Sequence, residues 1–259
     1  MKNPSINIGP TAAPIVSILM PVYNAEKYLH QSVASILEQK GVSKFEVIII
    51  DDGSTDKSFD ILQEMGDERF LILRQRENKG IVRSLNIGML RTTAPLIARM
   101  DADDVMHPER LIKQINFMRQ NPFLTACGTY FDYINEDSRV TGAAMQFPIQ
   151  PPDVREAFKK FTAIGHPTAM FRKDFLFKLA PDLYSSKYPY CAEDLGLWLK
   201  LLSRKALLAN LGEVLLHYRV HSGQTGAKVR EREKEQVALV YQDWAHLVWP
   251  AKEEIEVQA

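Results

Sequence analysis

Cysteine is scarce in this sequence: Cys127 and Cys191 are the only two among 259 residues. Two cysteines are too few for a disulfide framework and are compatible with a reducing compartment. No apolar run approaches the roughly 20 residues that a membrane-spanning helix needs, and Met1–Pro14 is without the apolar core of a signal peptide. We therefore expect a soluble protein of the cytoplasm.

Excess charge of either sign is also missing. Lys and Arg total 32, and Asp and Glu total 32, so the formal net charge is +0. No global field attracts nucleic acid or anionic lipid, and any anionic ligand must be held locally. The apolar fraction of 46% is ordinary for a globular protein with a substantial core. The chain has no repeat and no Gly/Ser linker that would mark a domain boundary.

Strand-like and helix-like segments alternate four times in the first 105 residues. The expected strands are Val16–Met20 (stopped by Pro21), Phe45–Ile50, Phe70–Leu73 and Leu96–Met100. The expected helices are one capped by Asn24 and ended by Gly41, a short one over Phe59–Met65, and one within Gly80–Thr92. This alternation predicts a parallel sheet with helices on both faces.

Three polar clusters follow strands of that sheet: Val22–Asn24, Asp51–Ser54 and Asp101–Asp104. Open sheets of this kind bind ligands beyond the carboxyl ends of their strands, so the clusters should meet in one crevice. The third cluster has three carboxylates in four residues, which repel each other unless a cation or water separates them. An acidic turn that caps the next helix is the alternative.

The second half is less regular. We expect helices over Pro108–Gln120, Asp153–Phe161, Glu193–Ser203 and Val229–Val248, and strands over Leu124–Tyr133, Thr168–Phe171 and Val214–Tyr218. Thr141–Pro152 and Arg219–Lys228 are expected to be loops, the second of them mobile.

Five segments in order resemble the motifs of family 2 glycosyltransferases, which are inverting enzymes that use nucleotide sugars. They are Val16–Asn24, Val47–Asp56, Asn78-Lys79-Gly80, Ala98–Arg110 and Glu193-Asp194. The resemblance covers about residues 15 to 220. It implies an α/β chain with the GT-A fold, a nucleotide-binding, Rossmann-like mixed sheet with helices on both faces. The expected organisation is a flexible leader (1–14), a glycosyltransferase domain (15–228) with nucleotide-binding (15–105) and acceptor-binding (106–228) halves, and a C-terminal helix (229–259).

The resemblance also implies how the donor is held. Mn²⁺ or Mg²⁺ would neutralise its diphosphate, with Asp103 as the direct ligand and Asp101 at the ribose or the water shell of the metal. Asp104 is not assigned to the metal and would cap the following helix. His221 would supply a further metal or phosphate contact when its loop closes, or would be a surface histidine.

For the base of the nucleotide, Asp52 is expected against uracil with Pro21 beside it, and Tyr23 offers a surface for stacking. The alternative for Asp52 is a turn pair with Asp51 ahead of Gly53. Arg83 would reach the pyrophosphate or be a solvated helix arginine.

Inversion at the sugar carbon requires one base that takes the proton of the acceptor hydroxyl. The family places this carboxylate at Glu193-Asp194, with Asp194 as the base and Glu193 at the sugar or the acceptor. The alternative is a pair of acids favoured by a helix N-terminus. His166 would contact donor sugar or acceptor, or would be a core histidine.

The sequence departs from processive synthases of the family, because Gln242-Asp243-Trp244 does not match their Gln-x-x-Arg-Trp element. We therefore expect transfer of single sugars, from a UDP-hexose to a surface polysaccharide, glycan or lipid-linked acceptor, with a peripheral membrane contact where a membrane delivers the acceptor. A nucleotidyltransferase that makes sugar nucleotides is one alternative, although its Gly-rich basic loop is missing at Pro21–Asn24. A nucleotide-sugar-binding protein without catalysis is another, and it would not need Asp194.

Overall fold

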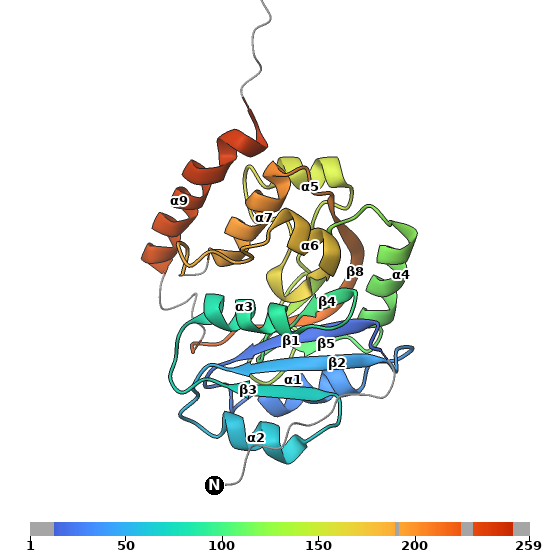
Figure 1. The fold of residues 1–259 in the computed structure, drawn as a ribbon. Coiled ribbons are helices and arrows are strands. Elements are labelled where there is room, and N and C mark those ends of the chain that lie inside the picture. The colour runs from blue at the N-terminus through green and yellow to red at the C-terminus, as the bar shows by residue number, and fades with distance from the viewer. Residues whose placement is uncertain (1–12, 190–191, 224–229, 251–259) are drawn as a thin grey trace, which may run out of the picture.

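A single mixed sheet organises the chain (Figure 1). The computed structural model describes residues 13–189, 192–223 and 230–250. Within these ranges the strands lie in the order β3-β2-β1-β4-β7-β6-β8-β5. Their bounds are β1 Val16–Val22, β2 Phe45–Asp51, β3 Phe70–Arg74, β4 Leu96–Arg99, β5 Val105–Met106, β6 Ala126–Ile134, β7 Met170–Arg172 and β8 Leu208–Arg219.

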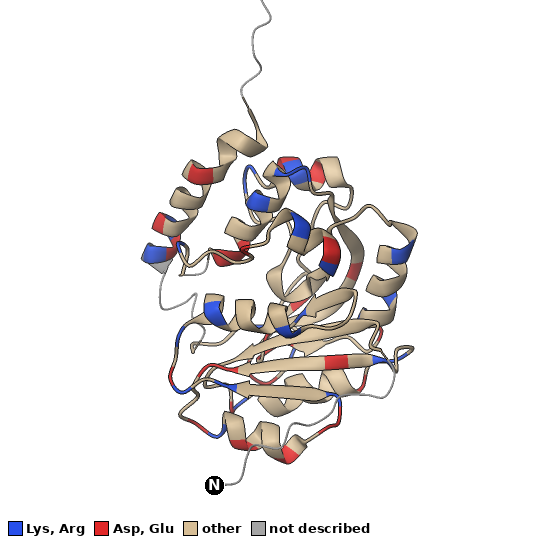
Figure 2. Cartoon of the chain, viewed as in Figure 1, with Lys and Arg blue, Asp and Glu red and all other residues tan. Residues whose placement is uncertain are grey.

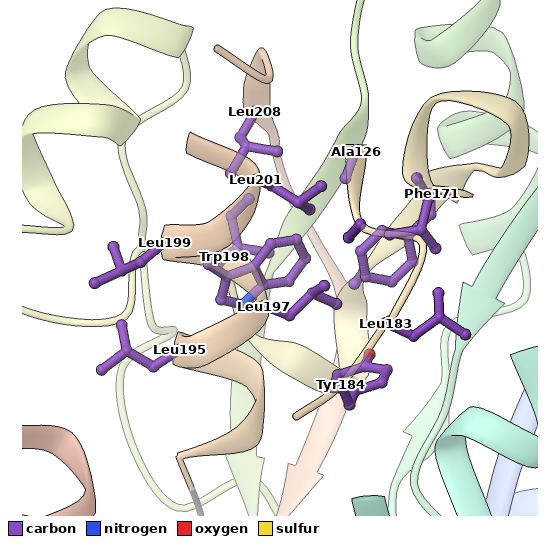
Figure 3. Packing of buried hydrophobic residues seen from close by; sticks show 14 of the residues in the cluster. Ala126, Phe171, Leu183, Tyr184, Leu195, Leu197, Trp198, Leu199, Leu201 and Leu208 are labelled. Atoms are coloured by element: carbon purple, nitrogen blue, oxygen red, sulfur yellow. The ribbon is translucent and has the colours of Figure 1, made fainter. Parts of the chain in front are cut away.

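Helices cover both faces of this sheet (Figure 1). One layer of core contains side chains from α1 (Leu29–Leu37), α2 (Ser58–Met65) and α4 (Arg110–Gln120). The opposite layer contains side chains from α3 (Ile81–Arg91), α5 (Pro151–Ala157), α6 (Lys173–Leu179), α7 (Glu193–Ser203) and α9 (Arg230–Val248). Trp198 of α7 is stacked on Phe171 of β7, with ring centroids 5.2 Å apart, and so ties α7 to the sheet (Figure 3).

The parallel half of the sheet is as predicted, with β3, β2, β1 and β4 as parallel neighbours. The expected stop at Pro21 is wrong, because β1 continues to Val22. Pro21 pairs with Ile50 of β2, while the pairing of β1 with β4 ends at Leu19 and Arg99. A proline is tolerated where one neighbouring strand has already ended.

The expected helix cap at Asn24 is also wrong. The N-cap of α1 is Tyr28, without a side-chain capping bond. Asn24 has a positive φ of 49°, and its Oδ1 accepts a hydrogen bond from the Thr55 N–H at 2.9 Å. Asn24 therefore joins the tip of β1 to the tip of β2.

The second half turns the sheet from parallel to mixed. β7 runs antiparallel to both β4 and β6, and β6 runs parallel to β8. The predicted strand over Thr168–Phe171 is partly wrong, since a 3-10 turn occupies His166–Thr168 and β7 begins at Met170. The strand predicted over Val214–Tyr218 is the last part of β8, which begins at Leu208, and α6 was not predicted.

Arg155 of α5 fixes the orientation of the two helices next to it. Its guanidinium donates to the carbonyl of Leu202 at the end of α7, at 3.1 Å, and to the carbonyl of Val248 at the end of α9. Helix C-termini favour a cation, so one arginine serves both ends.

Basic and acidic residues are mixed along α9 (Figure 2). Among the described residues, no helix combines the length and the apolarity needed to cross a membrane.

Candidate active site

Six strands end at one edge of the sheet. β1, β2, β3 and β4 are parallel, and β7 is antiparallel to both β4 and β6, so β6 and β8 run in the same direction as β4. The carboxyl ends of these six strands therefore share an edge, which is where sheets of this kind bind ligands. The predicted polar clusters follow β1, β2 and β4 at this edge.

Asp52 lies at the tip of β2 and is 3% exposed. Its Oδ1 accepts hydrogen bonds from the Lys79 N–H at 2.9 Å and from Gln75 Nε2 at 2.5 Å, and its Oδ2 accepts one from the Gly80 N–H at 2.8 Å. Asp52 thus holds the loop that begins α3 against the tip of β2. Gly53 permits this close approach, because a Cβ there would lie 2.5 Å from the carbonyl carbon of Glu77.

The residues near Asp52 that were considered for nucleotide binding differ in their solvent exposure. Asp51 is fully buried, accepts from the Ser54 N–H at 3.1 Å and pairs with Arg74, so it is the one that builds the turn. Tyr23 is 48% exposed at the tip of β1, next to the partly buried Pro21. Arg83 is exposed on α3, and its Nε donates to Gln75 Oε1 at 3.1 Å, so it reaches Asp52 only through Gln75.

An acidic turn follows β4. One carboxylate oxygen each of Asp101, Asp103 and Asp104 lie within 4.8 Å of one another. Asp101 bonds to Arg99, Asp103 Oδ2 lies 3.0 Å from Nε2 of His221, and Asp104 Oδ1 accepts from the N–H of Arg219 at 2.9 Å. The structure therefore brings His221 to Asp103, the acid that was predicted to be the direct metal ligand.

The electrostatics of this turn fit a divalent cation. Burial raises the pKa of Asp101, and the charge of Asp103 adds to this while Arg99 opposes it. Burial holds the pKa of Asp104 well above the usual carboxyl range, and the charges of Asp103 and Asp101 raise it further. Oδ2 of Asp104 is buried and has no hydrogen-bond partner within the described part of the chain. Crowded carboxylates with an unpaired oxygen are a set of hard ligands of the kind that Mg²⁺ and Mn²⁺ prefer.

A second acidic group, the pair Glu193 and Asp194, lies in the first turn of α7. Glu193 is 6% exposed, and its Oε2 has no hydrogen-bond partner among the described residues. Burial raises the pKa of Glu193 to about 8, with a contribution from the charge of Asp194. Burial also raises the pKa of Asp194 to about 6. Both values place these carboxyls in the range useful for proton transfer near neutral pH.

Arg99 connects the two acidic groups. It is the last residue of β4, is 2% exposed, and bonds to Asp101. Its charge also opposes the raised pKa of both Glu193 and Asp194. Its backbone N–H donates to the carbonyl of Ala169 at 2.8 Å, next to the 3-10 turn whose His166 lies 3.8 Å from Glu193. The charge of Asp101 in turn raises the pKa of Glu193. The predicted metal ligands and the predicted base therefore share one electrostatic environment.

His166 lies beside Glu193 at the start of α7. Its Nε2 is 2.8 Å from the hydroxyl of Tyr184, and its Nδ1 is 3.8 Å from Oε1 of Glu193. Burial and the charge of Arg99 lower the pKa of His166 well below its usual value, so the ring is neutral. Asn86 of α3 holds Tyr184 in place, accepting from its N–H at 3.0 Å and donating to its carbonyl at 2.8 Å.

Arg99, Tyr184 and Arg219 were missed by the sequence reasoning. Arg99 and Arg219 are charged residues that are buried at strand ends. A charged side chain two residues before the first of three acids was a usable signal for Arg99, because buried charges are paired. Tyr184 carried no comparable signal.

A sequence profile of glycosyl transferase family 2 matches residues 17–179. The chain belongs to this family. An uncharacterized glycosyltransferase of Haemophilus influenzae is 33% identical over 231 residues, which is 86% of this chain and 70% of that protein. The UDP-Glc:alpha-D-GlcNAc-diphosphoundecaprenol beta-1,3-glucosyltransferase WfaP of Escherichia coli is 29% identical over 215 residues, covering 82% of this chain and 80% of WfaP.

Solved structures of glycosyltransferases share the fold. The family 2 chain resembles S. aureus TarS 1-349 in complex with UDP-GlcNAc, with a TM-score of 0.72 and 19% identity over 90% of this chain and 69% of that one. It also resembles the mannosyltransferase PcManGT of Pyrobaculum calidifontis in complex with GDP-Man and Mn²⁺, with a TM-score of 0.66 and 18% identity over 91% of this chain and 65% of that one. The predicted GT-A fold is thereby confirmed.

Proposed function

We propose that this family 2 enzyme transfers one sugar from a UDP-hexose to a hydroxyl group of a lipid-linked or growing polysaccharide acceptor, with inversion at the sugar carbon. The observation that carries the proposal is the chain of contacts from the acidic turn to α7: Arg99 bonds to Asp101, and its N–H donates to Ala169 of the segment whose His166 lies 3.8 Å from Glu193. The names of relatives support the choice of ligands, since WfaP uses a UDP-sugar and a diphosphoundecaprenol-linked acceptor.

The donor lies across the tips of β1, β2 and β4 in this proposal. Tyr23 stacks on the base, Asp52 and Pro21 contact uracil, and Arg83 approaches the pyrophosphate. Asp103, Asp101 and His221 would hold Mn²⁺ or Mg²⁺, and such an ion stabilises the charge that develops on a departing diphosphate. The net charge of +0 is consistent with a bound cation, because the chain has no general excess of Lys and Arg that would neutralise the diphosphate.

Asp194 acts as the general base. Its carboxylate takes the proton of the acceptor hydroxyl as the hydroxyl oxygen forms its bond to the anomeric carbon. The bond from that carbon to the phosphate oxygen breaks at the same time, and its electron pair leaves with the diphosphate. With its pKa of about 8, Glu193 is mostly protonated at pH 7 and can donate a hydrogen bond to the sugar or the acceptor. The neutral His166 adds no charge beside it.

Turnover of a panel of nucleotide sugars tests the proposed function. The panel contains UDP-glucose, UDP-galactose, UDP-GlcNAc and GDP-mannose, each with Mn²⁺ and with an undecaprenyl-diphosphate-linked sugar as acceptor. We expect release of UDP from one UDP-hexose, and an NMR spectrum of the product in which the new linkage has the opposite anomeric configuration to the donor. Turnover of GDP-mannose and of none of the UDP-sugars would contradict the proposal, and so would a new linkage with the anomeric configuration of the donor.

The rate should depend on pH through Asp194. Because its pKa is raised to about 6, the base is ionised above that pH and protonated below it, so kcat/KM should fall about tenfold per unit as the pH decreases through this range. The charge of Glu233 on α9 contributes to the raised pKa. We expect Glu233→Gln to move the acid limb to lower pH.

Glu235→Gln is the matched control for this measurement, since Glu235 is exposed on the same helix. Its pH profile should superimpose on that of the parent enzyme. An acid limb that stays in place in the Glu233 variant would show that the charge of Glu233 does not act on the group that sets it.

A further inference from the structure

Arg219 ends β8 directly behind the acidic turn, and it is fully buried. Its backbone N–H donates to Asp104 Oδ1 at 2.9 Å, and its Nε donates to the carbonyl of Asp103 at 2.7 Å. One residue thus binds the main chain of the predicted metal ligand and the side chain of the next acid.

The other nitrogens of the same guanidinium bind two further segments. Nη1 donates to the carbonyl of Asn135 at 2.9 Å and to Oγ of Ser138 at 3.0 Å, both in the turn after β6. Nη2 donates to Oε1 of Gln31 on α1 at 2.7 Å. The planar group therefore joins the acidic turn, the β6 turn and α1 in a fixed arrangement.

An aromatic ring extends this arrangement to His221. The guanidinium carbon of Arg219 lies 4.5 Å from the ring centroid of Tyr28, and the ring of His221 lies 4.9 Å from the same tyrosine. Nε2 of His221 is 3.0 Å from Asp103 Oδ2. Arg219 thus contacts Asp103 directly and shares Tyr28 with His221.

We propose that Arg219 is a positioning residue for the cation site, which holds the acidic turn and His221 in the geometry that a metal requires. This proposal rests on the metal-dependent function proposed above. Partners that orient metal ligands typically contribute about 10–100-fold to metal affinity. Lysine cannot replace the arginine here, because a single ammonium group does not present the planar set of donors that reaches three segments at once.

Arg172 offers a matched control. It ends β7 at the opposite edge of the sheet, where it pairs with Leu96 at the start of β4. Its guanidinium also donates to backbone carbonyls, those of Leu124 at 3.2 Å and Met118 at 2.8 Å, and lies 5.6 Å from the ring of Phe175. Arg172→Lys removes a similar set of bonds without touching the acidic turn.

The first measurement is the equilibrium affinity for Mn²⁺. Electron paramagnetic resonance reports it, because the signal of the free ion decreases as Mn²⁺ binds. We expect Arg219→Lys and Arg219→Met to weaken Mn²⁺ binding by about 10–100-fold, and Arg172→Lys to leave it unchanged. Equal affinities of the parent and the Arg219 variants would overturn the proposal, and so would an equal loss in the Arg172 variant.

The second measurement uses the metal-free proteins and separates this proposal from the metal itself. Hydrogen exchange of the amides of residues 101–106 should be faster in Arg219→Lys than in the parent and unchanged in Arg172→Lys, because local opening follows the loss of local bonds. Unchanged exchange in the Arg219 variant would overturn the positioning role. If the parent binds no Mn²⁺ but the Arg219 variant still opens the turn, the metal-dependent function fails and the positioning role stands.

Discussion

Replacing Asp194 with asparagine is expected to lower kcat by about 10²–10⁴-fold, which is the usual contribution of a general base. The amide cannot take the proton of the acceptor hydroxyl, whereas the size and the position at the start of α7 are preserved. An interaction made only in the transition state lowers kcat and kcat/KM together. Donor affinity should therefore be unchanged, as measured by calorimetric titration of the UDP-sugar.

Asp153→Asn provides the control for this substitution. Asp153 also lies in the first turn of a helix, α5, but it is exposed. The control should turn over at the parental rate. A rate in Asp194→Asn equal to that of the control would exclude Asp194 as the base. A parent protein that binds the donor but neither transfers nor hydrolyses it would indicate a binding protein without catalysis.

The second large effect is expected from Asp103→Ala. In the presence of Mn²⁺, UDP at a concentration of about 100 times the dissociation constant of UDP stabilises the folded state by about 2.7 kcal/mol. This raises the melting temperature by about 5–10 °C for a chain of this size. Loss of Asp103 removes the proposed metal ligand and the partner of His221. The thermal shift should disappear in the variant, as followed by differential scanning fluorimetry.

Asp137→Ala is the control here, because Asp137 is an exposed acid in the turn after β6. It should keep the full shift. A shift in Asp103→Ala as large as that of the control would contradict a role for Asp103 in holding the metal. UDP alone should give a smaller shift than UDP with Mn²⁺ in the parent protein.

The fold of the first 105 residues was predictable because its signals are local. Short, mostly apolar strands such as Phe45–Ile50, separated by amphipathic helices, permit few arrangements other than a parallel sheet, and the polar residues after each strand then lie at one edge. Errors at Pro21 and Asn24 arose because each residue was interpreted within its own segment. Pro21 is tolerated because β4 has ended beside it, and Asn24 bonds to Thr55 on another segment.

The second half was less predictable because its contacts join residues far apart in sequence. β7 pairs with β4 and β6, and no local pattern indicates that partner choice. Arg219 bonds to residues of three distant segments, and Tyr184 reaches His166 from a loop held by Asn86. The sequence motifs supplied the candidate acids, but not the basic and aromatic side chains that the structure places around them. The division into leader, two halves and C-terminal helix stays a prediction, and residues 1–12 lie outside the described part.

The central claim is that the acidic turn after β4 fixes a cation that holds the diphosphate of the donor. Calorimetric titration of the parent protein with UDP, once with Mn²⁺ and once with a chelator, tests this claim most directly. We expect UDP to bind with Mn²⁺ and to bind much more weakly with the chelator. Equal affinity under the two conditions would contradict the claim.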